Sequence, residues 1–198
     1  MKFLFKTLIF SLLLAGCQGK TSNHHVEKEK EDQHSNHEKN ETADEGKKKP
    51  LSPRVASMAN IGNAHIHIDY GSPSKRGRMI FGGLVGYGQV WATGAHKATS
   101  IDFSSEVIIN EVSIPSGKYG LFTIPGELEW VIIINKVWDM HLADDYSEEF
   151  DLVRVTVPVE ISSEPVESLT FEVYEENETS GYISIKWDLT AVKLPVKL

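Results

Sequence analysis

Residues 169–187 read LTFEVYEENETSGYISIKW, and this stretch decides the fold. Its two ends, 169–174 and 183–187, each alternate apolar and polar side chains. Successive side chains of a β-strand point to opposite faces, so each end predicts a strand with one face in a core and the other in water. The residues between them, 177–181, are types that favour turns. The stretch therefore predicts an antiparallel hairpin.

The sequence on both sides of this hairpin shows a similar β-strand pattern and has no helical periodicity of useful length. Short runs of β-branched and aromatic residues alternate with Gly, Pro, Asn and Ser. The predicted strands are Ala64–Tyr70, Ala98–Phe103, Glu106–Ile114, Tyr119–Ile124, Trp130–Asn135, Leu152–Val159, Ser168–Tyr174, Tyr182–Trp187 and Val192–Val196. About nine or ten strands in a domain of this size predict an all-β fold, an antiparallel β-sandwich or jelly roll.

Turn sequences order the middle strands. Residues 115–117 (Pro-Ser-Gly) and 125–127 (Pro-Gly-Glu) each separate two of these runs, so the strands are predicted to follow one another as a meander. Residues 130–134 (Trp-Val-Ile-Ile-Ile) are apolar at every position. That run predicts a central strand covered on both faces.

The beginning of the chain, residues 1–16, predicts a signal peptide. Lys2 and Lys6 flank the start of a short apolar run that small residues follow, and the run is shorter than the roughly 20 residues of a membrane-spanning helix. Residues 14–17 (Leu-Ala-Gly-Cys) resemble the lipobox of bacterial lipoproteins, which implies that Cys17 becomes acylated. The lipid bilayer is then a partner, and the chain lies in the cell envelope, outside the cytoplasm. A plain signal peptide with an accidental cysteine is the alternative.

Residues 17–52 predict a disordered tether behind the lipidated Cys17. Between residues 18 and 50 only two side chains are aliphatic, too few to offset the conformational entropy of folding. Short histidine-rich tracts can capture Zn or Cu weakly. A polar linker also accumulates histidine as one more hydrophilic residue, and both interpretations stay open. The histidines concerned are His24, His25, His34 and His37.

The folded domain is predicted to span residues 53–198, and its charge limits its partners. It carries 11 Lys and Arg against 20 Asp and Glu. This excess of negative charge opposes binding to phosphate backbones, so nucleic acid is not expected as a partner. Cys17 is the only cysteine of the chain, so a metal in the domain would need nitrogen, oxygen or thioether ligands.

Four histidines are the candidate metal ligands of the domain: His65, His67, His96 and His141. The first two are two residues apart on a predicted strand, so they share a face, while Ile66 and Ile68 point the other way, toward the core. The other two lie at strand ends, where loops form sites. Together they would suit Cu, Zn or Fe, although on the strand motif alone an exposed polar face that uses histidine twice is slightly favoured.

Neighbouring residues could complete such a metal site. The carboxylates of Asp69, Asp144 and Asp145 could hydrogen-bond the imidazoles and fix their orientation. Met140 could add a soft ligand, although packing is its more usual role. The four tryptophans are scattered along the sequence, and core packing is expected for most of them.

A basic run, Lys75-Arg76-Gly77-Arg78, offers a different chemistry. Arg76 or Arg78 could receive a carboxylate or phosphate bidentately, or could form salt bridges within this acidic domain. Neither a Ser-His-Asp spacing nor a phosphate-binding loop is present in the sequence.

Several segments together resemble the bacterial family called domain of unknown function 2911. The resemblance covers nearly the whole predicted domain and implies a secreted or lipid-anchored β protein, but it implies no reaction and no ligand set. The segments that carry it are Leu51–Pro53, Asp69–Pro73, Arg76–Val85, Val90–Thr99 and Gly117–Pro125.

Three functions follow as hypotheses. The first is a membrane-anchored lipoprotein whose β-sandwich binds a transition metal through the histidine cluster. The second is a metal-dependent enzyme, an oxygenase or hydrolase, because the His65-x-His67 strand resembles the cupin metal motif; the Glu expected a few residues later is absent. The third is a metal-free binding or structural lipoprotein of the envelope.

Overall fold

The computed structural model describes residues 50–198, and these form ten β-strands and one short 3-10 turn. The predicted signal peptide and the predicted tether, with Cys17, His24, His25, His34 and His37, lie outside the described residues. The elements are β1 (Arg54–Ile61), β2 (Ala64–Gly71), β3 (Thr99–Phe103), β4 (Val107–Ile109), β5 (Val112–Ile114), β6 (Gly117–Ile124), β7 (Glu129–Asn135), η1 (Glu148–Phe150), β8 (Asp151–Pro158), β9 (Glu160–Asn177) and β10 (Ser180–Lys197). No helix among residues 50–198 is long and apolar enough to cross a membrane.

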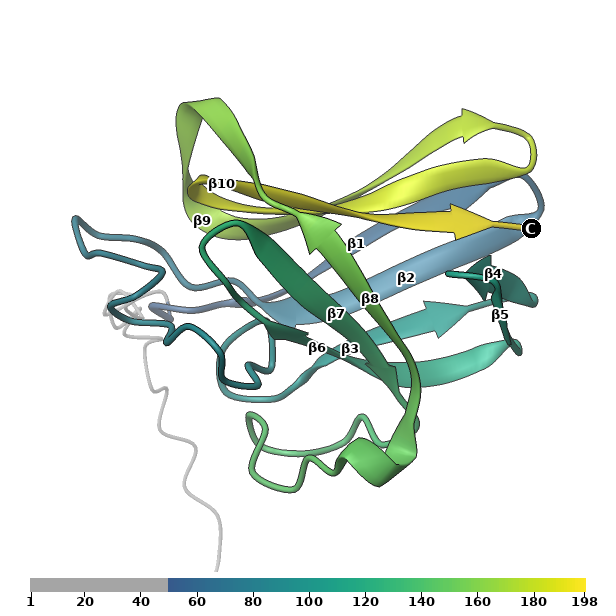
Figure 1. Ribbon diagram of the computed structural model, residues 1–198, viewed down its shortest axis with the longest axis horizontal. Coiled ribbons are helices and arrows are strands. Elements are labelled where there is room, and N and C mark those ends of the chain that lie inside the picture. The colour runs from purple at the N-terminus through teal and green to yellow at the C-terminus, as the bar shows by residue number, and fades with distance from the viewer. Residues whose placement is uncertain (1–49) are drawn as a thin grey trace, which may run out of the picture. The chain divides into compact units, whose positions relative to one another are not determined.

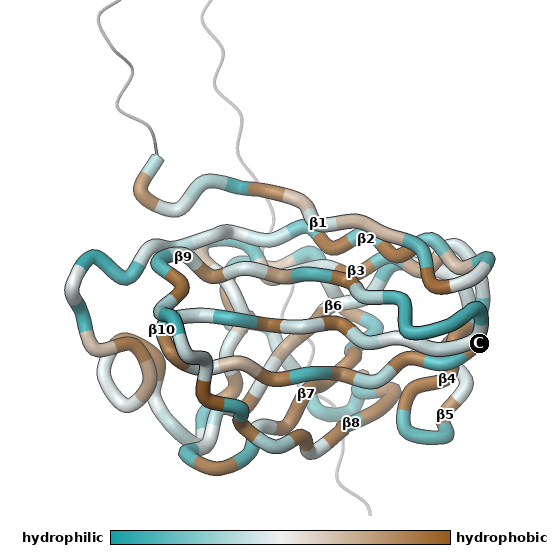
Figure 2. Tube along the Cα trace, turned by 90° about the horizontal axis from the view of Figure 1, so that it is seen from above, coloured by the Kyte–Doolittle hydropathy of each residue, from teal (hydrophilic) through white to brown (hydrophobic). Residues whose placement is uncertain are grey.

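Two antiparallel sheets face each other, which confirms the predicted all-β sandwich (Figure 1). One sheet has six strands in the order β1-β2-β3-β6-β7-β8, and the other has four in the order β5-β4-β10-β9. Hydrophobic and hydrophilic residues alternate along the strands (Figure 2), and the inward residues of both sheets make the main core. Its largest members include Trp130, Trp187, Phe103 and Phe171, all almost completely buried.

A second, smaller core covers the outer face of the six-stranded sheet. Phe122 on β6 and Ile133 on β7 are fully buried there, against Ala92, Ala98 and Met140 from two loops. Ile132 and Ile134, on the other face of β7, belong to the main core. The prediction of a β7 strand covered on both faces is therefore confirmed, and Met140 packs rather than presenting its sulfur to solvent.

The hairpin predicted at residues 169–187 forms, with β9 and β10 longer than expected. Their pairing runs from Ser180↔Asn177 to Ala191↔Glu160, with register shifts around Asp188. Asp188 has a left-handed φ of 53°, and this irregularity joins two runs predicted as separate strands into one. Pro165 is accommodated in β9 because β9 is an edge strand, where a missing N–H costs no ladder bond.

Three further details differ from the sequence prediction. The run 106–114 is a hairpin, because Asn110 and Glu111 both adopt left-handed φ angles, 49° and 64°, as a two-residue turn requires. The turn at 115–117 joins strands of different sheets, so the meander holds only for β6-β7-β8. β1 was not predicted, since its sequence RVASMANI is poor in β-formers; it pairs with β2 along its whole length.

Candidate functional site

The loop between β2 and β3, residues 72–98, folds over one end of the sandwich and carries the candidate site. Its first part is fastened to the second sheet: the Ser72 hydroxyl donates to the carbonyl oxygen of Leu169 (2.8 Å), and the backbone N–H of Lys75 donates to that of Glu167 (2.7 Å). The Lys75 ammonium pairs with Asp188 at 2.5 Å. The irregular residue of β10 thus helps to fix the start of the loop.

The second part of the loop approaches the end of β2 very closely. A Cβ atom on Gly71 would lie 2.3 Å from the carbonyl oxygen of Ala95, so a side chain at this position would push the loop away. The loop returns to the sheet where the backbone N–H of Trp91 donates to the carbonyl oxygen of Thr123 (2.8 Å). The backbone N–H of Ala98 likewise donates to the carbonyl oxygen of Met140 (3.0 Å). Backbone contacts therefore place Trp91 and His96 over the end of the sandwich.

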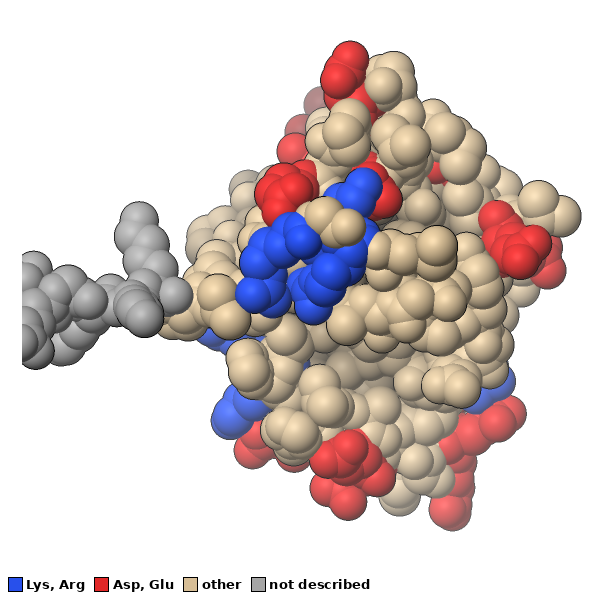
Figure 3. Space-filling model, turned by 90° about the vertical axis from the view of Figure 1, so that its left-hand side faces the viewer, with Lys and Arg blue, Asp and Glu red and all other residues tan. Residues whose placement is uncertain are grey.

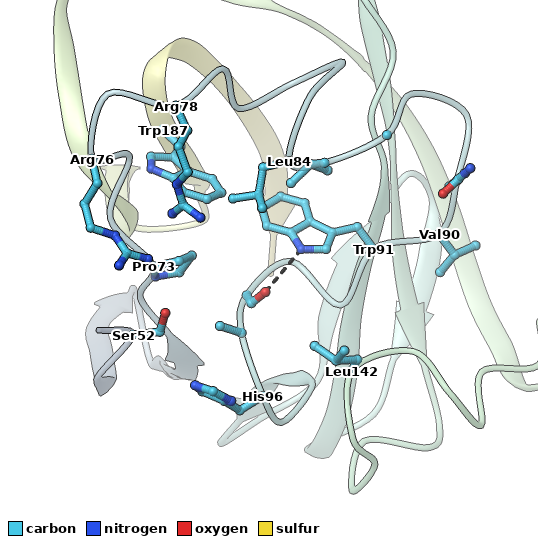
Figure 4. Close-up of a pocket in the computed structure, with 15 residues that line it drawn as sticks. Ser52, Pro73, Arg76, Arg78, Leu84, Val90, Trp91, His96, Leu142 and Trp187 are labelled. Atoms are coloured by element: carbon cyan, nitrogen blue, oxygen red, sulfur yellow. Dashed lines mark hydrogen bonds between the residues drawn. The ribbon is translucent and has the colours of Figure 1, made fainter. Parts of the chain in front are cut away.

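A cavity of about 360 Å³ lies between this loop, β10 and the segment around Leu142 (Figure 4). Its floor contains two indoles, Trp91 and Trp187, whose rings stack at 6.0 Å with 20° between their planes. Both indole N–H groups are already used, because Trp91 donates to Gly94 (3.2 Å) and Trp187 donates to Glu167 (3.2 Å). The floor offered to a ligand is therefore apolar.

Two guanidinium groups line the same cavity. Arg78 is held by its own loop, with Nε donating to Lys75 (3.0 Å) and one terminal nitrogen donating to Ser74 (2.6 Å). Within residues 50–198 the Arg76 guanidinium has neither an ion pair nor a hydrogen bond; only its backbone N–H is engaged, by Glu167 (2.9 Å). Among the described residues, neither arginine forms the internal salt bridge that was the alternative prediction. Their neighbour Lys75 forms one, with Asp188.

The backbone around the cavity is unusual. Three non-glycine residues that line it have left-handed φ angles: Arg76 (48°), His96 (68°) and Leu142 (48°). Thr93 (50°) lies between the lining residues Trp91 and Gly94. Such conformations are costly for residues with a Cβ atom and tend to concentrate at functional sites.

The segment that carries Leu142 is held by a polar network. The Tyr146 hydroxyl donates to Asp151 (2.7 Å) and accepts from Arg154 (2.8 Å), and Asn135 also donates to Asp151 (2.7 Å). Burial, together with the hydrogen bond to Asp151, raises the pKa of Tyr146 to about 12. The protonated phenol is the form that fits this network.

The strand histidines point away from the cavity. Ile66 and Ile68 are fully buried, as predicted, so His65 and His67 share the outer face of the six-stranded sheet. His65 is exposed, with Nδ1 2.8 Å from the side-chain oxygen of Asn60, at the turn between β1 and β2. His67 lies opposite Met58 on β1 and Asp102 on β3.

The loop histidines lie at the other end of the molecule. The carbonyl oxygen of His96 accepts a hydrogen bond from the backbone N–H of Leu142 (2.7 Å). Lys97 and His141 form an isolated antiparallel β-bridge, so the two loops pair through their backbones. His96 lines the cavity, while His141 is exposed with Nδ1 2.9 Å from Asp144. Asp144 thus hydrogen-bonds the His141 imidazole, while its predicted support of a metal ligand stays a prediction.

The structure does not bring the four predicted histidines together. Residues 50–198 contain no group of three or more His, Cys, Asp and Glu side chains that could hold a metal ion. The physical reason is the strand direction, since His65 lies at the turn end of β2 while His96 and His141 lie beyond its other end. Asp69 pairs with Arg54 instead of an imidazole, and Asp145 is exposed.

Sequence reasoning missed the tryptophans as part of a site. Trp91 and Trp187 are 96 positions apart in the sequence, so only the sandwich brings them together. The local signals of this cavity were the basic run at 75–78 and His96, in a loop at a strand end.

The geometry defines the class of the protein as an antiparallel β-sandwich with a cationic, indole-floored cavity at one end. The family model described as "Protein of unknown function (DUF2911)" matches residues 52–196. The chain belongs to this family, as its sequence segments indicated. Searches of curated proteins and of solved structures gave no match.

Proposed function

We propose that this protein is a lipid-anchored binding protein of the cell envelope whose cavity takes a small amphipathic anion. The single observation that carries the proposal is Arg76, a guanidinium without a partner among the described residues, in the lining of a cavity that also contains the indoles of Trp91 and Trp187. The lipobox-like sequence ending at Cys17 supports the anchor. The tether would let the domain reach its ligand outside the cytoplasm.

The chemistry of the lining selects the ligand. A guanidinium offers a planar fork of donors that matches a carboxylate, sulfonate or phosphate. The side chains of Leu84, Val90 and Leu142 and the ring of Trp91 supply apolar contacts for the rest of the molecule. None of the residues lining this cavity is acidic, so an anion meets no opposing carboxylate there.

The test is a fluorescence titration of the full chain with 8-anilinonaphthalene-1-sulfonate, an anion with apolar rings. We expect one equivalent to bind, and we expect the double variant Arg76→Ala/Arg78→Ala to bind at least 10-fold more weakly. The reason is the loss of charge-assisted hydrogen bonds, each worth about 1.5–3 kcal/mol.

A matched control removes the same charge elsewhere. Lys136→Ala/Lys197→Ala takes two exposed cations from positions that do not line this cavity. It should leave the titration unchanged. Equal titrations for the wild type and the arginine double variant would refute the proposed site.

Transition-metal binding is the second candidate, favoured by the Asp144 carboxylate that holds His141 as it would hold a metal ligand. A site built on His96 and His141 would need further ligands from water. Elemental analysis of the purified full chain tests it, and about one equivalent of Cu, Zn or Fe, lost in His141→Ala, is the result that supports it.

A further inference from the structure

A second cavity, of about 470 Å³, lies on the outer face of the six-stranded sheet beside the first. Its walls come from β1, β2, β3 and β6, from the loop before β3, and from the segment that follows β7. Three of its lining residues are cations: Arg54, Lys97 and Lys118. Trp138, which is 37% exposed, adds an aromatic ring.

The two cavities adjoin. Ser52, Ala95 and His96 line both of them, so the loop at 95–96 forms the ridge between the two. His96 has the largest left-handed φ angle of the non-glycine residues in residues 50–198, 68°. The strained backbone is therefore placed where one cavity leads into the next.

Positive charge is concentrated along this path. Five of the 11 Lys and Arg of residues 53–198 line the two cavities, compared with two of the 20 Asp and Glu. In the space-filling view a group of Lys and Arg stands on the face at the loop end, with Asp and Glu around it (Figure 3). An acidic domain that gathers nearly half of its cations around two adjoining cavities is arranged for an anion.

The three cations of the second cavity differ in how strongly other groups of the protein already bind them. Arg54 is committed to the fold, because it pairs with Asp69 and donates to the backbone of Lys97 (3.1 Å) and Ala98 (3.2 Å). Lys97 reaches Asp139 at 3.3 Å, an exposed pair of little strength. The Lys118 ammonium stands 4.1 Å from the centre of the Trp138 ring and has no ion pair within residues 50–198.

We propose that the two cavities are consecutive subsites for one extended ligand, an acidic oligosaccharide. This inference rests on the proposed function, whose anion site it extends. Asp69 and Asp139 would repel a densely charged chain such as polyphosphate, but they can accept hydrogen bonds from hydroxyl groups. A chain with spaced carboxylates and many hydroxyls fits this mixture, and the Trp138 and Trp91 rings can pack on the apolar faces of sugar rings.

Calorimetric titration of the full chain with galacturonate and with its linear hexamer tests the inference. We expect the hexamer to bind at least 10-fold more tightly than the monomer, because it engages both subsites. Lys97→Ala/Lys118→Ala should remove most of this advantage while leaving the anilinonaphthalenesulfonate titration unchanged. Lys136→Ala/Lys197→Ala is the control with the same charge loss and should bind the hexamer like the wild type.

Other outcomes overturn the inference. Equal affinity for hexamer and monomer, tighter binding of polyphosphate than of the hexamer, or equal binding of neutral cellohexaose would each do so. If the hexamer has no advantage while Arg76→Ala/Arg78→Ala still weakens the fluorescent anion, only the extended ligand is wrong. If that arginine variant changes neither titration, the proposed function fails as well.

Discussion

The two ends of the sandwich use the same backbone conformation for different purposes. At the β4–β5 end, Asn110 and Glu111 have left-handed φ angles because a two-residue hairpin turn requires them. At the opposite end, Arg76, His96 and Leu142 adopt such angles and all line one cavity (Figure 1). Arg76 and Leu142 also lie in turns, closed by hydrogen bonds from the Arg78 N–H to Lys75 (3.0 Å) and from the Asp144 N–H to His141 (3.1 Å), whereas no such turn bond spans His96 among residues 50–198. The comparison teaches that a left-handed residue indicates a site only after the local turn has been taken into account.

The largest effect is expected where the cavity end shares the main core. Trp187 is 1% exposed and belongs both to the cavity floor and to the core. Trp187→Ala should lower the free energy of unfolding by about 3–5 kcal/mol, measured by urea denaturation, because it leaves a large void. Val112→Ala, at the β4–β5 end and 37% exposed, should cost less than about 1 kcal/mol. Similar losses would show that the cavity end is not part of the core.

An intermediate effect is expected in the network that holds the Leu142 segment. Tyr146→Phe removes the hydroxyl that donates a hydrogen bond to Asp151. It should lower the free energy of unfolding by about 1–2 kcal/mol at neutral pH. The folded-state pKa of Tyr146 is about 12, above the ordinary value of 10.0. Its contribution is therefore fully present below pH 10 and is lost as the pH rises toward 12, because the unfolded chain releases this proton first.

Denaturation curves at several alkaline pH values check this contribution. The stability of the wild type should decline between pH 10 and pH 12, and the decline should be shallower in Tyr146→Phe. Part of it should persist, since burial also raises the pKa of Tyr70. Identical slopes in the two proteins would contradict the role assigned to Tyr146.

The smallest effect directly tests the comparison of the two ends. Glu111→Gly should raise the free energy of unfolding by up to about 1 kcal/mol, because glycine adopts the left-handed angle of the turn without steric cost. It should leave anion binding unchanged. His96→Gly relieves the same kind of strain but removes a cavity wall, so it should weaken binding of the hexamer. If both variants bound alike, strain at His96 would have no connection with the site.

Much of the fold could be predicted because β alternation is a local property. The hairpin at 169–187, the covered run at 130–134 and the core positions Ile66 and Ile68 needed only the period of two. β1 was missed, because its pairing with β2 and its contact with β9 compensate for residues of low β propensity. The turn at 110–111 was missed since Asn-Glu is an unusual choice for it.

The candidate site could be predicted only in part. The basic run with Arg76 and Arg78 was visible as a possible anion site, and Asp144, predicted to support a metal-binding imidazole, lies beside His141. The joint placement of the four histidines could not be predicted, because it depends on which end of a strand meets which loop. Residue type and spacing within one strand contain no information on that arrangement.

The sequence by itself determined the all-β class and the faces of the strands, since each follows from neighbours within a few residues; the lipid anchor at Cys17 stays a prediction from the sequence. Only the tertiary structure decided that Trp91, Trp187 and the arginines share one cavity, and that a second cationic cavity adjoins it at His96. The physical reason is that a cavity forms from loops and strands distant in sequence. Their meeting is fixed by how two sheets pack and how the chain crosses between them.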